Sequence, residues 1–191
     1  MSNINQLNSS NNVINVINVI NVIVIIDTDR IINDPSIKSV SKDQAHPTPI
    51  GHQYSYMVAP NQSAISGEGT GDLNIRANRD DVIRWTGISE SANSDSSVLI
   101  YGLPRYAGDT VFTQVEFVNS SRLEAEPAPT NNTSPFPVTF TEQKHWYTQA
   151  TITKLGTEQY QVQFALYHRP HGGNQELYGY FQWDPTITVK E

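Results

Sequence analysis

The sequence predicts an all-β protein, either an antiparallel β-sandwich or a jelly-roll-like single domain, with an extended N-terminal β arm. Hydrophobic residues make up 37% of the chain and charged residues only 16%, a profile typical of turn-rich β proteins. Short runs of alternating apolar and polar residues recur along the chain, each bounded by Gly, Pro, Asn or Asp. No convincing amphipathic helix separates these runs, which favours a sandwich over an α/β fold.

The N-terminal segment is unusual because Asn-Val-Ile repeats four times over residues 12–23. A three-residue period fits neither a helix nor a half-buried strand, yet β-branched residues at two of every three positions favour extended structure. Extended at about 3.3 Å per residue, residues 13–27 span about 50 Å, whereas a globule of this size is about 40 Å across. We therefore expect one end to project from the domain or to pair with a neighbouring copy.

The candidate self-assembly residues of this arm are Val13, Ile14, Val16, Ile17, Val19 and Ile20. The alternative interpretation is a tolerated low-complexity expansion without ordered structure. The length of 191 residues fits one domain, so we divide the chain into an arm, residues 1–19, and a single β-sandwich domain, residues 20–191.

The remaining alternating runs predict strands, and two Pro- and Ser-rich stretches, 34–49 and 121–137, predict surface loops or crossings. The predicted strands cover residues 53–59, 73–77, 81–85, 97–101, 110–118, 138–141, 146–153, 159–168 and 176–183.

Charge and composition exclude several classes of function. The net charge of −7, with no cluster of Lys or Arg, repels phosphate backbones and argues against nucleic acid as a partner. The chain has no Cys, which excludes disulfides and thiolate chemistry. Asn interrupts the apolar N-terminal run, and no basic residue precedes Arg30, so we predict neither a membrane span nor a signal peptide. We expect a cytoplasmic protein without a cofactor.

Two constellations could bind a ligand. Asp27 and Asp29 follow the first predicted strand with two-residue spacing, which puts both carboxylates on one face and within reach of Ca²⁺ if further oxygens join them. Turn capping is the commoner role of such residues. His168 and His171 are a weak metal signal in a predicted loop. Neither pair indicates a metal site strongly.

Aromatic residues are dense near the C-terminus, where alternation places Tyr178 and Tyr180 on one face and Phe181 and Trp183 on the other. One set is expected in the core, and an exposed set, drawn from Tyr178, Tyr180 and Trp183, could stack on sugar rings or on another protomer. No nucleophile elbow and no Ser, His and Asp cluster is present. Catalysis therefore has no positive evidence.

Five blocks of the sequence resemble the AidA/PixA family of bacterial inclusion-body proteins. They are residues 21–29 (NVIVIIDTD), 69–75 (GTGDLNI), 81–85 (DVIRW), 156–162 (GTEQYQV) and 179–185 (GYFQWDP). The resemblance implies a cytoplasmic protein of soil-, plant- or animal-associated bacteria that forms crystalline inclusions in some members. No catalytic residues carry over. With only two Met, a methionine-storage role does not transfer.

Two functions follow as hypotheses. The first is a non-catalytic protein that self-assembles into inclusion bodies, in association with a host, with itself as the partner. The alternative is a carbohydrate-binding, lectin-like sandwich that binds a glycan, with or without calcium. An enzyme of unfamiliar architecture ranks last.

Overall fold

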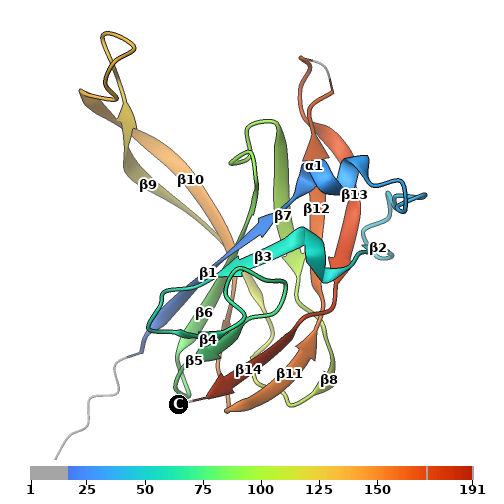
Figure 1. Cartoon of the computed structure of the whole chain (residues 1–191). Coiled ribbons are helices and arrows are strands. Elements are labelled where there is room, and N and C mark those ends of the chain that lie inside the picture. The colour runs from blue at the N-terminus through green and yellow to red at the C-terminus, as the bar shows by residue number, and fades with distance from the viewer. Residues whose placement is uncertain (1–16, 171, 191) are drawn as a thin grey trace, which may run out of the picture.

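The computed structural model describes residues 17–170 and 172–190, and nearly all regular structure in this part of the chain is β (Figure 1). The strands are β1 (Val19–Ile26), β2 (Thr48–Pro49), β3 (Ser55–Val58), β4 (Ala64–Ser66), β5 (Asn74–Arg76), β6 (Val82–Ser89), β7 (Ser96–Gly102), β8 (Arg105–Gly108), β9 (Glu116–Pro127), β10 (Val138–Thr151), β11 (Gly156–Tyr160), β12 (Val162–His168), β13 (Glu176–Trp183) and β14 (Thr186–Lys190). The helix α1 (Thr28–Asn33) and a 3₁₀ turn (His52–Tyr54) complete the elements.

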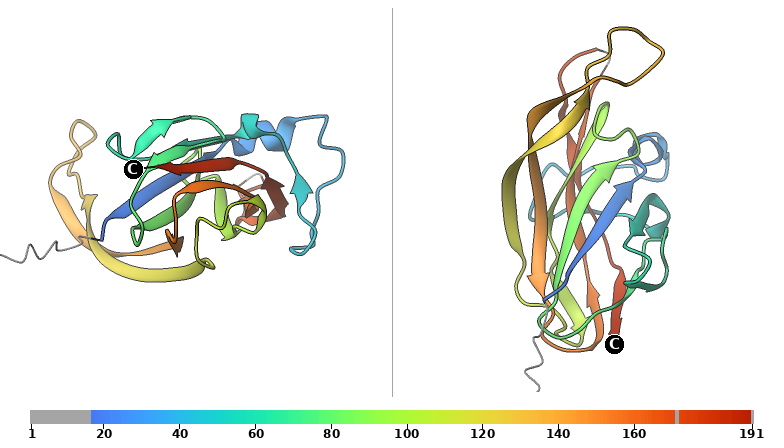
Figure 2. Two further views of the ribbon diagram at one scale, coloured as in Figure 1. Left: turned by 90° about the horizontal axis from the view of Figure 1, so that it is seen from below. Right: turned by 90° about the vertical axis from the view of Figure 1, so that its left-hand side faces the viewer.

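The strands form three sheets, which confirms the all-β prediction. Their orders are β3-β1-β6-β10-β9, β4-β5-β14-β11-β8 and β2-β13-β12-β7. Most pairings are antiparallel, but β1 with β6, β2 with β13 and β5 with β14 are parallel. The sheets are therefore mixed rather than antiparallel throughout. Figure 2 shows them wrapped around a common centre, with β9 and β10 extending to one side.

The second half of β1 has a neighbouring strand on both sides. This differs from the expectation that the N-terminal arm would present an exposed edge. β1 runs parallel to β6 along its whole length and antiparallel to β3 from Ile23 to Ile26. Its side chains alternate between inside and outside, with Ile20, Val22, Val24 and Ile26 buried. This strand is anchored in the sheet by its β-branched residues.

The strand ends where Asp27 begins α1. The carboxylate of Asp27 accepts a hydrogen bond from the backbone N–H of Arg30 at 3.0 Å, as a helix N-cap does. Glu90 accepts hydrogen bonds from the backbone N–H groups of Thr28, at 2.7 Å, and Asp29, at 3.2 Å. The backbone N–H groups in the first turn of the helix therefore find their hydrogen-bond acceptors within the chain.

One continuous hydrophobic core connects the three sheets. Trp85 packs edge-on against Phe112 with a ring separation of 5.3 Å, and Phe112 against Tyr160 at 6.4 Å. Phe164 then contacts Trp183 at 6.0 Å. All of these side chains are buried, so the aromatic residues supply much of the area that holds the sheets together.

Buried Asp81 joins the start of β1 to the start of β6. Its Oδ1 accepts a hydrogen bond from the backbone N–H of Asn18 at 2.9 Å, and its Oδ2 accepts one from the backbone N–H of Asn78 at 2.8 Å. Asp81 is 3% exposed. A single carboxylate therefore fixes the point at which the chain enters the first strand.

We expect Asp81→Ala to lower the free energy of unfolding by about 2–3 kcal/mol, because two charge-assisted hydrogen bonds are lost. Urea denaturation followed by tryptophan fluorescence measures this loss. Asp80→Asn is the matched control, since it removes the same charge from an exposed neighbour and is expected to change stability by less than about 0.5 kcal/mol. Equal losses in the two variants would contradict the anchoring role of Asp81.

The structure differs from the predicted strands in several places. The predicted loop 121–137 is strand up to Pro127, because β9 continues that far. The separate strands 138–141 and 146–153 are a single strand, β10. β14 was not among the predicted strands, and the predicted run 110–118 holds only the beginning of β9. In the described part of the chain, the short α1 offers no apolar segment long enough to span a bilayer.

Candidate functional site

The most distinctive surface lies on the hairpin of β9 and β10, which extends away from the three sheets (Figure 1). The two strands pair without interruption from Glu116 opposite Gln149 to Pro127 opposite Val138. Only the base of β10 joins the sheet, through Thr148–Thr151 paired with β6. Most of the hairpin is therefore open to solvent on both faces.

One face of this hairpin carries its exposed apolar side chains, although the exposed polar residues Asn119, Ser121, Glu142 and Lys144 share that face. Residues directly opposite in an antiparallel pair share a face, so the register groups odd-numbered residues of β9 with even-numbered residues of β10. Five large hydrophobic side chains are exposed on this face and at the tip of the hairpin, namely Phe117 (63%), Leu123 (72%), Phe136 (68%), Val138 (40%) and Phe140 (67%). We call this surface, together with Trp146, the hairpin face.

The opposite side of the same hairpin is polar. Nε2 of His145 lies 2.6 Å from Oε1 of Glu124, and the amide of Gln143 donates to Glu126. The guanidinium of Arg84 stacks over the ring of Tyr147 at 4.6 Å. The exposed large apolar side chains therefore lie on one side of the hairpin, and the half-buried polar contacts lie on the other.

At its base the hairpin face continues into an apolar groove of about 500 Å³. The groove is lined by Leu99, Ile100, Tyr101, Phe117 and Trp146, so it joins β7 to the hairpin. The hydroxyl of Tyr101 donates to the carbonyl of Gln44 at 3.0 Å, and burial is the main reason that the pKa of Tyr101 is raised to about 12. The groove has the apolar lining that is common at docking surfaces.

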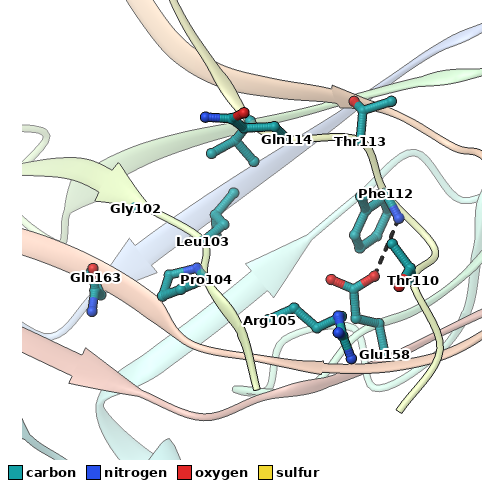
Figure 3. Close-up of a pocket in the computed structure, with 11 residues that line it drawn as sticks. Gly102, Leu103, Pro104, Arg105, Thr110, Phe112, Thr113, Gln114, Glu158 and Gln163 are labelled. Carbon is teal, nitrogen blue, oxygen red and sulfur yellow. Dashed lines mark hydrogen bonds between the residues drawn. The ribbon is translucent and has the colours of Figure 1, made fainter. Parts of the chain in front are cut away.

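A second concavity, of about 430 Å³, lies near Glu158 (Figure 3). Gly102, Leu103, Pro104 and Arg105 line one side, Thr110, Phe112, Thr113, Gln114 and Val115 line the other, and Glu158 and Gln163 complete the lining. Figure 3 shows one carboxylate oxygen of Glu158 directed toward the backbone of the opposite segment and the other directed into the pocket.

Glu158 holds the segment that leads from β8 to β9. Its Oε2 accepts hydrogen bonds from the backbone N–H groups of Val111, at 2.6 Å, and Phe112, at 3.2 Å. Glu158 is 4% exposed. Burial raises the pKa of this carboxyl above its ordinary value, although the two backbone hydrogen bonds oppose the shift. The arrangement fixes the path of the chain into the hairpin.

The structure divides the predicted assembly arm. Val13, Ile14 and Val16 lie outside the described residues. Ile17 and Val19 are exposed, at 61% and 42%, as an assembly role requires, whereas Ile20 is 3% exposed and packs in the core. Ile20 is therefore a structural residue of β1, because strand alternation turns it inward.

The three candidate ligand-binding aromatics do not form an open platform. Trp183 is 1% exposed, and its Nε1–H donates to the carbonyl of Gly71 at 3.0 Å. Tyr178 is covered by the ammonium group of Lys42, which lies 5.8 Å from the ring centre. Tyr180 packs edge-on against Tyr101 at 5.7 Å. Trp183 belongs to the core, and the two tyrosines are half-buried.

The candidate metal residues are placed differently from the geometry expected of them. Asp27 caps α1 and Asp29 lies in its first turn, so the two do not share a strand face. Nδ1 of His168 lies 3.1 Å from the hydroxyl of Ser96, and His171 is outside the described residues. Among residues 17–170 and 172–190, no group of three or more His, Cys, Asp or Glu is arranged to hold a metal ion.

Sequence reasoning missed the hairpin face because its residues lie within or beside the stretch interpreted as a loop. Leu123 is surrounded by Ser, Arg and Glu, and Phe136 and Phe140 follow a Pro- and Ser-rich run. The available signal was the spacing of Phe136, Val138 and Phe140, which alternates as a strand does.

The three mixed sheets and the hairpin that extends from them define an all-β protein with exposed apolar side chains on β9 and β10. Comparison with known proteins specifies the class further. The sequence profile of the PixA family, described as inclusion body protein, matches residues 18–189. The chain therefore belongs to the PixA family of inclusion body proteins.

A solved structure supports the assignment. The crystal structure of an inclusion body protein (PixA) from Burkholderia cenocepacia J2315 superposes with a TM-score of 0.77 and 26% sequence identity. The similarity covers 93% of this chain and 99% of that chain. No curated protein matches the sequence significantly. The resemblance to the AidA/PixA family inferred from five sequence blocks is thus confirmed.

Proposed function

We propose that this chain is a non-catalytic protein of cytoplasmic inclusion bodies, and that it assembles with copies of itself through the hairpin face. The observation that carries the proposal is the concentration of exposed apolar side chains on β9 and β10. Of the eleven large hydrophobic side chains exposed in the described residues, five lie on this hairpin. Family membership supports an inclusion-body role.

The size of the surface fits a protein partner. Twelve paired residues extend about 40 Å at 3.4 Å per residue, and two strands are about 10 Å wide. The projected area of the whole hairpin is therefore on the order of 400 Å², and the exposed apolar side chains cover part of it. The adjoining groove of about 500 Å³ extends this surface at its base, and each partner of a standard interface contributes roughly 800 Å².

A second copy is the partner that best explains this face. In an inclusion body, each chain is surrounded by identical chains at high concentration. Another copy of the same chain can therefore cover even a modest apolar surface. The apolar tip around Phe136 and the apolar groove at the base occur on the same chain. The chain therefore supplies both halves of a contact.

The test is size-exclusion chromatography with light scattering over a range of concentrations. We expect the mass of the wild type to rise above the 21.3 kDa of the monomer. The double variant Leu123→Ser/Phe140→Ser is expected to stay monomeric, because it removes two of the most exposed apolar side chains. Thr139→Ser/Thr141→Ser, on the polar side of the same hairpin, is the matched control and should assemble like the wild type.

A wild type that stays monomeric at every concentration would contradict self-assembly. Equal assembly of the wild type and of Leu123→Ser/Phe140→Ser would remove the hairpin face from the mechanism. A chain that begins at Ile17 tests the arm residues Val13, Ile14 and Val16 separately. This start retains Asn18, which binds Asp81, and so leaves β1 anchored.

A further inference from the structure

The outer edge of β9 carries backbone groups that no strand in the described part of the chain pairs with. β9 is the last strand of its sheet, and with 12 residues it is longer than the other edge strands, of which β7, with 7 residues, comes next. Proteins usually keep edge strands short or covered. A long open edge is a surface to which another strand can add by backbone hydrogen bonding.

The pairing of β9 with β10 shows which residues present this edge. The backbone N–H of Ala128 donates to the carbonyl of Pro137, its partner, at 2.8 Å. Residues of an antiparallel strand direct their N–H and C=O groups alternately to the two sides. Even-numbered residues of β9 therefore bond toward β10, and odd-numbered residues, including Ser121, Leu123 and Ala125, present theirs at the open edge.

We propose that two copies of the chain pair their β9 strands antiparallel about a two-fold axis at Leu123, which joins two sheets into one. In this register Leu123 faces Leu123 of the second copy, and Ser121 faces Ala125. All three direct their backbone groups toward the partner, so the hydrogen-bonding pattern is satisfied without rearrangement. The inference rests on the proposed self-assembly and names the contact that begins it.

Charge selects this register among those that pair at least nine of the twelve residues of β9. Arg122 faces Glu124 of the second copy, and the two-fold axis repeats the pair, so two opposite-charge pairs flank Leu123. Centring on Ser120 or Ser121 instead sets Glu116 against a glutamate of the partner, and centring on Arg122 sets the two arginines against each other. Opposite charges directly across a sheet stabilise the pairing and like charges oppose it.

The same register brings the apolar tip of one copy to the groove of the other. Continued by two residues beyond β9, it sets Pro129 level with Phe117, which lines the groove. Pro129 belongs to the tip loop that also carries Phe136, 68% exposed. The paired hairpins therefore place the exposed apolar side chains of both copies on one continuous face, which remains available to further copies.

Crosslinking in the cysteine-free chain tests the axis. A Leu123→Cys variant, treated with a short bismaleimide at associating concentrations, is expected to give a covalent dimer, because residues facing each other in a hydrogen-bonded pair lie about 5.5 Å apart at Cα. Glu142→Cys is the matched control. It lies opposite Leu123 on β10, on the same face, and its two copies would be about 14 Å apart, three strand spacings.

Charge exchange tests the register. Arg122→Glu and Glu124→Arg each place like charges across the axis twice, so each is expected to weaken association by about tenfold. The combined variant Arg122→Glu/Glu124→Arg restores both pairs and is expected to recover the affinity of the wild type. Both positions are exposed in the monomer, and Glu124 contacts only the half-buried His145 among charged groups, so thermal melting at low concentration should change little.

The outcomes separate this inference from the proposed function. If the wild type associates but Glu142→Cys crosslinks as well as Leu123→Cys, the apolar faces stack on each other and the edge pairing is overturned. Failure of the combined variant to recover affinity also overturns the register. A wild type that never associates overturns both proposals. Crosslinking at Leu123 alone, together with recovery, supports the pairing.

Discussion

Replacing Trp183 by alanine is expected to lower the free energy of unfolding by about 3–5 kcal/mol, the cost of a large aromatic cavity. Trp183 is 1% exposed and lies 6.0 Å from the ring of Phe164. Its Nε1–H also donates to the carbonyl of Gly71 at 3.0 Å. The side chain thus links β13 to the glycine turn that precedes β5.

Urea denaturation followed by far-UV circular dichroism measures this effect without relying on the lost fluorophore. Trp183→Phe separates its two causes, because phenylalanine keeps much of the volume but cannot donate to Gly71. We expect a smaller loss for this variant than for alanine. A loss below about 1 kcal/mol for Trp183→Ala would be inconsistent with a fully packed side chain.

Glu158→Ala is expected to lower the free energy of unfolding by about 2–3 kcal/mol, because the backbone N–H groups of Val111 and Phe112 lose their acceptor. Glu158→Gln keeps an oxygen in place of Oε2 and is expected to retain most of the stability. Comparing the two variants distinguishes the lost hydrogen bonds from the lost charge. Equal destabilisation in both would contradict this assignment.

The same residue predicts a pH dependence. Burial raises the pKa of Glu158 in the folded state, so between the ordinary value of 4.5 and the raised value the folded state binds more protons than the unfolded state. Stability contributed by this group is therefore present below the ordinary pKa and is lost as pH rises through the raised pKa. The Glu158→Gln variant has no titrating carboxyl at this position, so it does not lose stability in this way as the pH rises.

Urea titrations of the wild type and of Glu158→Gln at a series of pH values from 4 to 7 measure the difference directly. We expect Glu158→Gln to gain stability relative to the wild type as pH rises. All other carboxylates are present in both proteins, so their contributions to the pH dependence of stability cancel in this comparison. A constant difference across the series would show that the pKa of Glu158 is not raised.

The elements that could be predicted from the sequence are those with one buried face. β6, β12 and β13 alternate between apolar inward and polar outward side chains, which gives the two-residue period of a half-buried strand. β9 was mistaken for a loop beyond residue 120 because both faces of the hairpin are exposed. Without a buried face, no selection for alternation marks the strand in the sequence.

The candidate sites were harder to predict than the fold. Tyr178, Tyr180 and Trp183 were grouped by their density, but density does not show which rings the rest of the chain covers. Asp27 was assigned to a strand because α1 has only six residues, too short for a helical period to appear. Parallel pairing of β1 with β6 also leaves no local signal, since the partners are distant in sequence.

The pairing of β1 with β6 has a consequence for synthesis. Val19 pairs with Val82, so during translation the first strand leaves the ribosome well before its longest neighbour in the sheet exists. At about 5–20 residues per second the interval is several seconds. During that time the Val- and Ile-rich strand β1 has no β6 with which to pair. Contacts between residues so far apart in the sequence also form slowly. The rate at which the nascent chain delivers Val82–Ser89 therefore sets how long its most apolar segment must avoid other chains.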